Sequence, residues 1–193
     1  LIMLKCRLTK QEVDNATEGE VKNGCLILKK QEYKEKAFEK RKDFNFVIAK
    51  NLKSVSSQLF YNSCLQLAFM PEVENIADEA FYNSHLTVIC FLKVKSAGDH
   101  AFQCCRNVIQ VFLPICEKLG EYCFWDCEKV KILNLPLVKT FWKTFGDGRQ
   151  FGLCYSLTDL IIPQAEKIGK CCFIDCNLLE SVNSKLDTTQ FKC

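Results

Sequence analysis

Cysteine is the residue type with the most chemistry to offer in this chain. There are 14 cysteines among 193 residues, and two segments place them almost identically: Lys118–Cys127 reads KLGEYCFWDC and Lys167–Cys176 reads KIGKCCFIDC. Thiols at fixed spacing can bind zinc, form disulfides or act as nucleophiles. The sequence contains no CxxC pair and only two histidines, His85 and His100, so zinc-ligand spacing is absent.

The sequence likewise shows no recognisable set of catalytic residues. A hydrolytic or transfer site needs a nucleophile, a base and an orienting group that converge in a cleft. Neither histidine has a Cys or Asp partner at a meaningful spacing, and no glycine-rich phosphate loop is present. We therefore expect a protein that is not an enzyme and that uses no metal or cofactor.

The overall composition and charge give no indication of binding to nucleic acid or to membranes. The chain is 48% hydrophobic and 25% charged, with a net charge of +3. This balance is ordinary for a globular domain and too weak to indicate binding to nucleic acid or to an anionic membrane. No apolar run is long enough to span a bilayer, so membrane insertion is not expected.

An internal repeat explains where the cysteines fall. Phenylalanine recurs at near-constant intervals of 21 or 22 residues, with one longer step of 27. These anchor phenylalanines are Phe38, Phe60, Phe81, Phe102, Phe124, Phe151 and Phe173. Proline stands ten residues before three of them, at Pro71, Pro114 and Pro163, and fifteen before Phe151, at Pro136.

Other columns of the repeat agree with this spacing. A small residue such as Gly98 or Gly120 lies four residues before the anchor, where we expect it to serve a turn. Before the proline position comes a β-like run, such as VIQVFL or LTDLII. A unit of strand, turn and short helix cannot bury its own apolar face, whereas stacked units can.

The pattern L-x-x-h-x-h-P-x-h-x-x-I-G-x-x-A/C-F-x-x-C resembles the BspA-like, or Treponema pallidum-type, leucine-rich repeats. It is clearest in residues 65–84, 108–127 and 157–176. Proteins of this class occur in bacteria and in parasitic protists, and the Cys-rich form here is similar to the protist branch, such as that of Entamoeba. The resemblance implies a non-catalytic protein-binding module, often a surface adhesin. It carries over no functional site position by position.

The expected fold is an α/β solenoid of about seven strand–turn–short-helix units with a parallel β-sheet on the concave face. We expect one domain over residues 1–193. Residues 1–21 would cap the N-terminus, where LIMLKCRLT would pair with GCLILKK, residues 22–178 would form the repeats, and residues 179–193 would be a C-terminal cap or a truncated repeat.

Alternation along each strand separates two faces. The residues six, three and one before the proline position are apolar throughout and should face the core, above a stacked spine of the anchors. The residues four and two before it form the opposite side, here called the strand face. Its twelve members are Phe46, Ile48, Leu67, Phe69, Val88, Cys90, Gln110, Phe112, Ile132, Asn134, Asp159 and Ile161.

Nine of these twelve are apolar, where such repeats often carry Thr, Ser or Glu. A contiguous exposed apolar stripe usually marks an interaction site. We predict that the strand face, and in particular Phe46, Ile48, Leu67, Phe69, Val88, Cys90, Gln110, Phe112, Ile132 and Ile161, binds another protein or a second copy of the chain. The alternative is that tighter curvature or the N-terminal segment covers the stripe.

The 27-residue unit is a second candidate site. It inserts about five residues between Val138 and Phe151 and brings together Phe141, Trp142, Phe145 and Arg149. Insertions in solenoids form loops on one side, and Trp and Arg are favoured at binding hot spots. The alternative is structural, with Phe141 in the core column of Ile168 and Trp142 covering a widened turn.

Most of the cysteines occupy small-residue columns of the repeat. Cys105, Cys127, Cys154 and Cys176 alternate with Ser63 and Ser84, and Cys123 and Cys172 alternate with alanine. We therefore expect buried free thiols rather than ladder disulfides or a metal cluster. Cys64, Cys104 and Cys171 share columns with polar residues and should be exposed and reactive.

The location in the cell is the least determined property. Unpaired thiols and the lack of a signal peptide favour the cytoplasm and an adaptor or regulatory scaffold. The family resemblance favours the cell surface and adhesion or host interaction.

Overall fold

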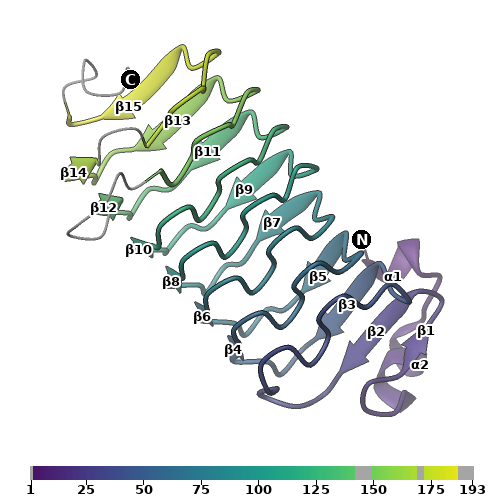
Figure 1. Cartoon of the computed structure of the whole chain (residues 1–193). Coiled ribbons are helices and arrows are strands. Elements are labelled where there is room, and N and C mark those ends of the chain that lie inside the picture. The colour runs from purple at the N-terminus through teal and green to yellow at the C-terminus, as the bar shows by residue number, and fades with distance from the viewer. Residues whose placement is uncertain (1, 142–148, 169–171, 187–193) are drawn as a thin grey trace.

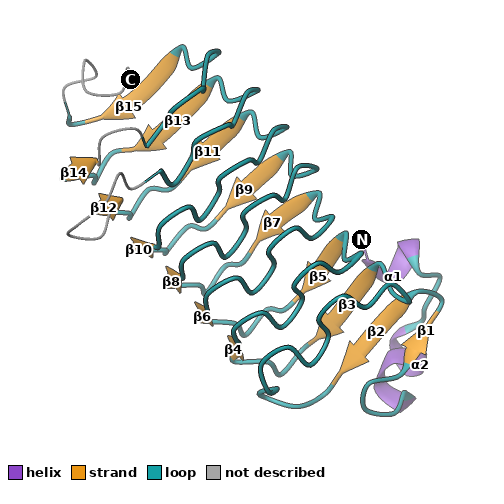
Figure 2. Ribbon diagram, viewed as in Figure 1, coloured by secondary structure: helices purple, strands orange, loops and turns teal. Residues whose placement is uncertain are grey.

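A computed structural model describes residues 2–141, 149–168 and 172–186. The chain winds into coils stacked along one axis, each coil giving a longer strand on one side and a two-residue strand on another (Figures 1 and 2). Two short helices, α1 (Ile2–Lys5) and α2 (Lys10–Asn15), lie at the N-terminal end. The longer strands are β2 (Cys25–Leu28), β3 (Phe46–Ala49), β5 (Leu67–Phe69), β7 (Val88–Cys90), β9 (Gln110–Phe112), β11 (Ile132–Asn134), β13 (Asp159–Ile162) and β15 (Ser181–Ser184).

The short strands form a second sheet. They are β4 (Ser54–Val55), β6 (Asn75–Ile76), β8 (Ser96–Ala97), β10 (Lys118–Leu119), β12 (Thr140–Phe141) and β14 (Lys167–Ile168), and they pair in parallel in that order. The expected solenoid with parallel sheets is confirmed. One difference is that the longer strands form two sheets, β1-β2-β3-β5 and β7-β9-β11-β13-β15, since β5 and β7 are not hydrogen-bonded strand neighbours.

The segment around each anchor phenylalanine folds as successive turns, and in the described residues these segments contain no regular helix. Backbone bonds such as Ser63 N to Phe60 O span three residues. Around Phe38, Phe60, Phe81, Phe102 and Phe124, the residues two before and two after the anchor have left-handed backbones, for example Gln58 (φ 54°) and Asn62 (φ 53°). A left-handed residue interrupts helical winding, and here it aims the N–H at the next coil: Asn62 N donates to Tyr82 O at 2.8 Å.

The seven anchor phenylalanines form the expected spine. They are buried, and neighbouring rings stack with centroids 5.2–5.8 Å apart and interplanar angles of 4–17°. Offset stacking at this separation is a favourable aromatic geometry. The inward strand columns are likewise buried, apart from the partly buried Ala68, so one continuous core cluster runs through the coils.

The N-terminal segment does not pair as a strand in the way expected for LIMLKCRLT. It forms α1 and α2, and only β1 (Val21–Lys22) pairs with β2, antiparallel. Thr9 and Glu12 make a capping box at the start of α2. Cys6, Leu8, Val13 and Ala16 are buried against Cys25, Ile27 and Ile48, so this segment covers the outer side of β2 and β3. At the other end, β15 pairs in parallel with β13.

Gly98 and Gly120, each four residues before an anchor phenylalanine, are needed for close packing and not for a turn conformation. Neither Gly98 nor Gly120 has a positive φ. A Cβ on Gly98 would lie 2.8 Å from the backbone nitrogen of Asp78, and one on Gly120 would overlap the backbone of Gly98 and Asp99. The neighbouring coil therefore leaves no room for a side chain on these two residues.

Candidate functional site

The strand face runs as two columns across β3 to β13. The register pairs Phe46 with Leu67 and Ile48 with Phe69 on one side of the break between β5 and β7. On the other side, Cys90 pairs with Phe112 and Phe112 with Asn134. Side chains of one column therefore lie side by side, about 4.8 Å apart within each sheet.

The N-terminal end of this stripe is covered, which corrects its expected extent. Ile48 is 2% and Leu67 is 6% exposed, and Phe46 is half-buried against the cluster built by Cys6, Leu8 and Val13. The physical reason is that apolar side chains of α1, α2 and the segment between them close over β2 and β3. Phe46, Ile48 and Leu67 are thus core-like residues with little surface left for a partner.

The middle of the stripe is open. Phe69, Phe112 and Ile132 are 49%, 43% and 49% exposed. Cys90 and Gln110 are also exposed, and Val88 and Ile161 are half-buried. From β11 onward polar residues enter the face: Asn134 in β11, Asp159 beside Ile161 in β13, and Ser181 and Asn183 in β15. The exposed apolar surface is therefore concentrated on β5 to β11.

Four further exposed apolar side chains precede or follow these strands in the chain. Leu92, Ile115 and Leu137 lie in the turns that follow β7, β9 and β11, and Ile109 immediately precedes β9. Sequence reasoning restricted to the strand columns missed them. Leu92 carries a signal that could have found it, because it occupies a position where four other coils have proline.

A groove of about 490 Å³ opens at the N-terminal end of the exposed surface. It is walled by α1 and by β3, β5, β7 and the turns after these strands. Its lining residues are Ile2, Met3, Ile48, Lys50, Leu67, Ala68, Phe69, Met70, Pro71, Val88, Cys90 and Leu92. Lys50 is the one charged residue among these twelve, and its ammonium is paired with Asp14 at 2.7 Å.

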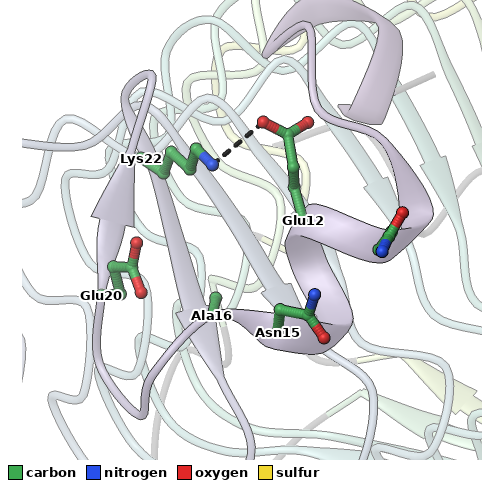
Figure 3. A pocket seen from close by; sticks show the side chains of 6 residues that line it. Glu12, Asn15, Ala16, Glu20 and Lys22 are labelled. Carbon is green, nitrogen blue, oxygen red and sulfur yellow. Dashed lines mark ion pairs between the residues drawn. The ribbon is translucent and has the colours of Figure 1, made fainter.

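A polar hollow of about 270 Å³ lies beside α2 and β1, lined by Gln11, Glu12, Asn15, Ala16, Glu20 and Lys22 (Figure 3). Lys22 Nζ is 2.9 Å from Glu12 Oε1 across it. Hydrogen bonds from the Thr9 backbone and from Lys22 lower the pKa of Glu12 to about 2. Because Glu12 is held by its helix cap and by this ion pair, the hollow has a structural rather than a catalytic arrangement.

The insertion is only partly described. Phe141 pairs with Ile168 between β12 and β14, which places its backbone in the core column expected for the structural alternative. Trp142 and Phe145 lie outside the described residues. The Arg149 guanidinium lies 5.9 Å from the centre of the Trp125 ring. A Cβ on Gly152 would overlap that ring, so glycine there makes room for Trp125.

The buried cysteines form a hydrogen-bond ladder. Each thiol in the column donates to the carbonyl oxygen of the anchor phenylalanine in the preceding coil: Cys105 to Phe81 at 3.2 Å, Cys127 to Phe102 at 3.3 Å, Cys154 to Phe124 at 3.3 Å and Cys176 to Phe151 at 3.0 Å. Cys105, Cys127, Cys154 and Cys176 are all free thiols. The thiols thus fill space as expected, and they also satisfy buried carbonyl groups.

Burial makes the Cys105, Cys123 and Cys127 thiols poor nucleophiles, whereas a hydrogen bond with Cys154 lowers the pKa of Cys176. Burial raises the pKa of Cys105 to about 12 and that of Cys123 well above 9.0, and thiolate is the reactive form. The expected reactive set also needs correction. Cys64 and Cys104 are half-buried rather than exposed, desolvation raises the pKa of Cys104, and Cys171 lies outside the described residues. Among the cysteines that the structure describes, Cys90 on the strand face is the exposed thiol.

The histidines do not build a site. His85 is exposed, and His100 stacks on Tyr122 with ring centres 5.1 Å apart. Within residues 2–141, 149–168 and 172–186, no three His, Cys, Asp or Glu side chains converge in a way that could hold a metal ion. Neither described helix approaches the length and apolarity of a bilayer span.

Comparisons with known proteins agree with this architecture. The profile of the BspA type leucine rich repeat region, in six copies, matches residues 31–145 and 143–192. The crystal structure of a leucine-rich-repeat protein of T. pallidum is similar with a TM-score of 0.67 and 20% identity, over 83% of this chain and 75% of that one. At this identity the likeness concerns the fold.

Two other solved structures are more distant. A leucine rich cell surface protein of Faecalibacterium prausnitzii has 15% identity and a TM-score of 0.33, over 76% of this chain and 61% of its own. A leucine-rich-repeat protein of Bacteroides ovatus has 19% identity and a TM-score of 0.41, over 72% and 49%. A comparison with curated proteins finds no match.

Proposed function

Because the chain belongs to the BspA-type leucine-rich-repeat family, we propose that it is a non-catalytic module that binds a protein partner through the open part of its strand face. Arrays of this kind generally serve as binding modules, since stacked coils present an extended surface whose residues can vary without changing the core. The partner surface we propose comprises Phe69, Val88, Cys90, Gln110, Phe112, Ile132 and Ile161. Phe46, Ile48 and Leu67 support it from beneath the N-terminal segment.

The observation that carries the proposal is the exposure of three large apolar side chains on β5, β9 and β11. Phe69, Phe112 and Ile132 each leave nearly half of their surface in water. Burying the exposed half of each would contribute on the order of 1 kcal/mol. Exposed apolar side chains of this kind mark protein contacts, and Leu92 lines the same groove as Phe69.

Affinity capture tests the proposal. Phe69→Asp with Phe112→Asp places two charges in the centre of the open face and should abolish capture of the partner. A matched control is Tyr155→Asp with Leu178→Asp, which makes the same charge change at two exposed apolar residues away from the strand face. The control should retain the partner. Equal capture by both double variants, each folded and of native mass, would remove the strand face from consideration.

The insertion is a second candidate for the contact, supported by the Arg149–Trp125 pair at its described end. Arginine over tryptophan is a frequent element of binding hot spots. Deleting Phe145–Arg149 should weaken capture if the loop contributes. Unchanged capture by the folded deletion variant would leave the strand face alone as the site.

Binding could take place at the cell surface or inside the cell, and a different observation favours each location. Adhesion or host interaction at the cell surface is suggested by the family. An intracellular adaptor or a self-associating scaffold is suggested by the free thiols among the described cysteines. Labelling of intact cells with a membrane-impermeant reagent separates surface from interior, and sedimentation of the purified chain reports self-association.

A further inference from the structure

The groove next to α1 has the shape and chemistry to accept an apolar ridge. Eleven of its twelve lining residues are uncharged, and ten of them are carbon-rich side chains other than cysteine. It lies where the longer strands divide into two sheets, between β5 and β7. Ala68, which the column pattern assigns to the core, is only partly buried there and helps line the groove.

The charges around the groove favour an uncharged occupant. The Lys50 ammonium is already compensated by Asp14, so the rim carries no net charge from this pair. An anion would compete with Asp14 for Lys50, and a cation would meet apolar walls that offer it no hydrogen-bond acceptors among their side chains. The groove therefore selects against charged groups at the point of contact.

The chain's own α1 shows which kind of element covers this face. This one-turn helix contacts β5, and its Ile2 and Met3 form one wall of the groove while joining the cluster over Ile48. Leu4 of the same helix is 81% exposed. Aliphatic helical side chains are thus already in contact with the first part of the strand face, and the uncovered part continues directly from them.

The spacing of the coils also suits a helix. Neighbouring strands repeat about every 4.8 Å, and residues three or four apart on a helix lie about 5–6 Å apart along one face. A helix crossing the strands could therefore offer one side chain to each coil. From β5 to β11 is three strand spacings, about 14 Å, which corresponds to about 10 helical residues at 1.5 Å each.

We propose that the groove and the open face beside it bind an amphipathic helix of a protein partner, which presents an uncharged aliphatic stripe and lies across the strands next to α1. This inference rests on the proposed function and specifies the partner's contact element. A second copy of the chain is a poorer occupant, because it would bring another groove rather than a ridge. The recognition is of the helix-in-groove type, read through anchors at i, i+3, i+4 and i+7.

A fluorescence anisotropy titration of the full chain tests the inference. The probe is an end-blocked, dye-labelled 14-residue peptide with Leu at i, i+3, i+4, i+7 and i+11, Ala beside them, and Gln, Glu and Lys on the opposite face. The control peptide has the same composition, scrambled so that the leucines share no face. We expect saturable binding of the first peptide at micromolar concentrations and at least tenfold weaker binding of the second.

Variants locate the site. Phe69→Asp and, separately, Cys90→Asp should weaken binding of the helical peptide at least tenfold, whereas Tyr155→Asp, an equal charge change outside the strand face, should leave it unchanged. Equal binding of both peptides, or equal affinity in all three variants, overturns the inference. A wild-type dimer that Phe69→Asp converts to a monomer would assign the groove to a second copy and also overturns it.

The two proposals fail in different ways. If the helical peptide does not bind but the Phe69→Asp, Phe112→Asp double variant still loses its captured partner, the strand face binds protein through another element. If the double variant keeps its partner, the proposed function itself is wrong, whatever the peptide does.

Discussion

Raising the pH above 9 should destabilise the array, because its buried thiols ionise more readily in the unfolded chain than in the folded one. Burial raises the pKa of Cys105 to about 12 and that of Cys116 to about 11, from an ordinary value of 9.0. The pKa values of Cys123 and Cys127 are raised well above 9.0 for the same reason. A raised folded-state pKa gives stability that is complete below pH 9 and is lost as the pH rises toward the folded value.

The size of the effect follows from linkage. At pH 10 an unfolded thiol is about ten times more often ionised than neutral, which favours the unfolded chain by about 1.4 kcal/mol for each thiol that stays neutral when folded. Cys105, Cys116, Cys123 and Cys127 together would then cost about 5 kcal/mol between pH 8 and pH 10. This loss is comparable to the whole free energy of unfolding of many domains.

Urea denaturation at pH 8 and at pH 10, followed by circular dichroism in the presence of a reductant, measures this loss. The double variant Cys105→Ser, Cys127→Ser is the matched control, since Ser63 and Ser84 occupy the same column and a hydroxyl can still donate to the phenylalanine carbonyl. Its loss of stability over the same pH interval should be about 3 kcal/mol smaller than that of the wild type. Equal losses in the two proteins would refute the reasoning.

Three further predictions concern the fold. Gly152→Ala should destabilise the chain by about 1–3 kcal/mol in urea denaturation, because its Cβ would overlap the Trp125 ring; a smaller effect in a Trp125→Leu background would confirm the cause, and an equal one would contradict it. Phe81→Leu and Phe102→Leu should couple by about 0.5–1.5 kcal/mol, since their rings stack at 5.4 Å, whereas Phe60→Leu and Phe124→Leu, which do not touch, should be additive within about 0.5 kcal/mol. The protection factors of the α2 amides should fall as the pH is lowered from 4.5 toward 2, because the lowered pKa of Glu12 stabilises the cap only while this carboxylate is ionised; unchanged protection factors in Glu12→Gln would argue against this role.

The repeat architecture was predictable because each coil must bury an anchor phenylalanine and the inward residues of its strand against the neighbouring coils. Phe60, Phe81 and Phe102 recur at a spacing that only stacking explains, and their rings stack as the columns predict. The inward strand residues were equally clear, because two-residue alternation separates them from the strand face. The same column comparison identified the cysteines as buried small residues.

The N-terminal cover, the turns around the anchors and the need for Gly120 depend on contacts between segments, and these contacts leave no repeating pattern in the sequence. The N-terminal residues before the first coil do not follow the repeat, so neither their helices nor their cover over Ile48 could be read from periodicity. The turns around the anchors look helical in sequence, and the left-handed residues that interrupt them include Tyr122 and Leu153, which are not typical of that conformation. The need for glycine at Gly120 comes from the approach of the neighbouring coil.

The thiol of Cys90 offers the most direct measurement of the central claim, because it lies exposed in the middle of the open strand face. Its rate of alkylation by iodoacetamide can be followed by peptide mass spectrometry in the free chain and in the complex with a captured partner. Cys64, in the connection between β4 and β5, serves as an internal reference. Binding through the strand face predicts that alkylation of Cys90 slows at least tenfold in the complex while that of Cys64 is unchanged. An unchanged rate at Cys90 in a stable complex would contradict the assignment of this face as the binding surface.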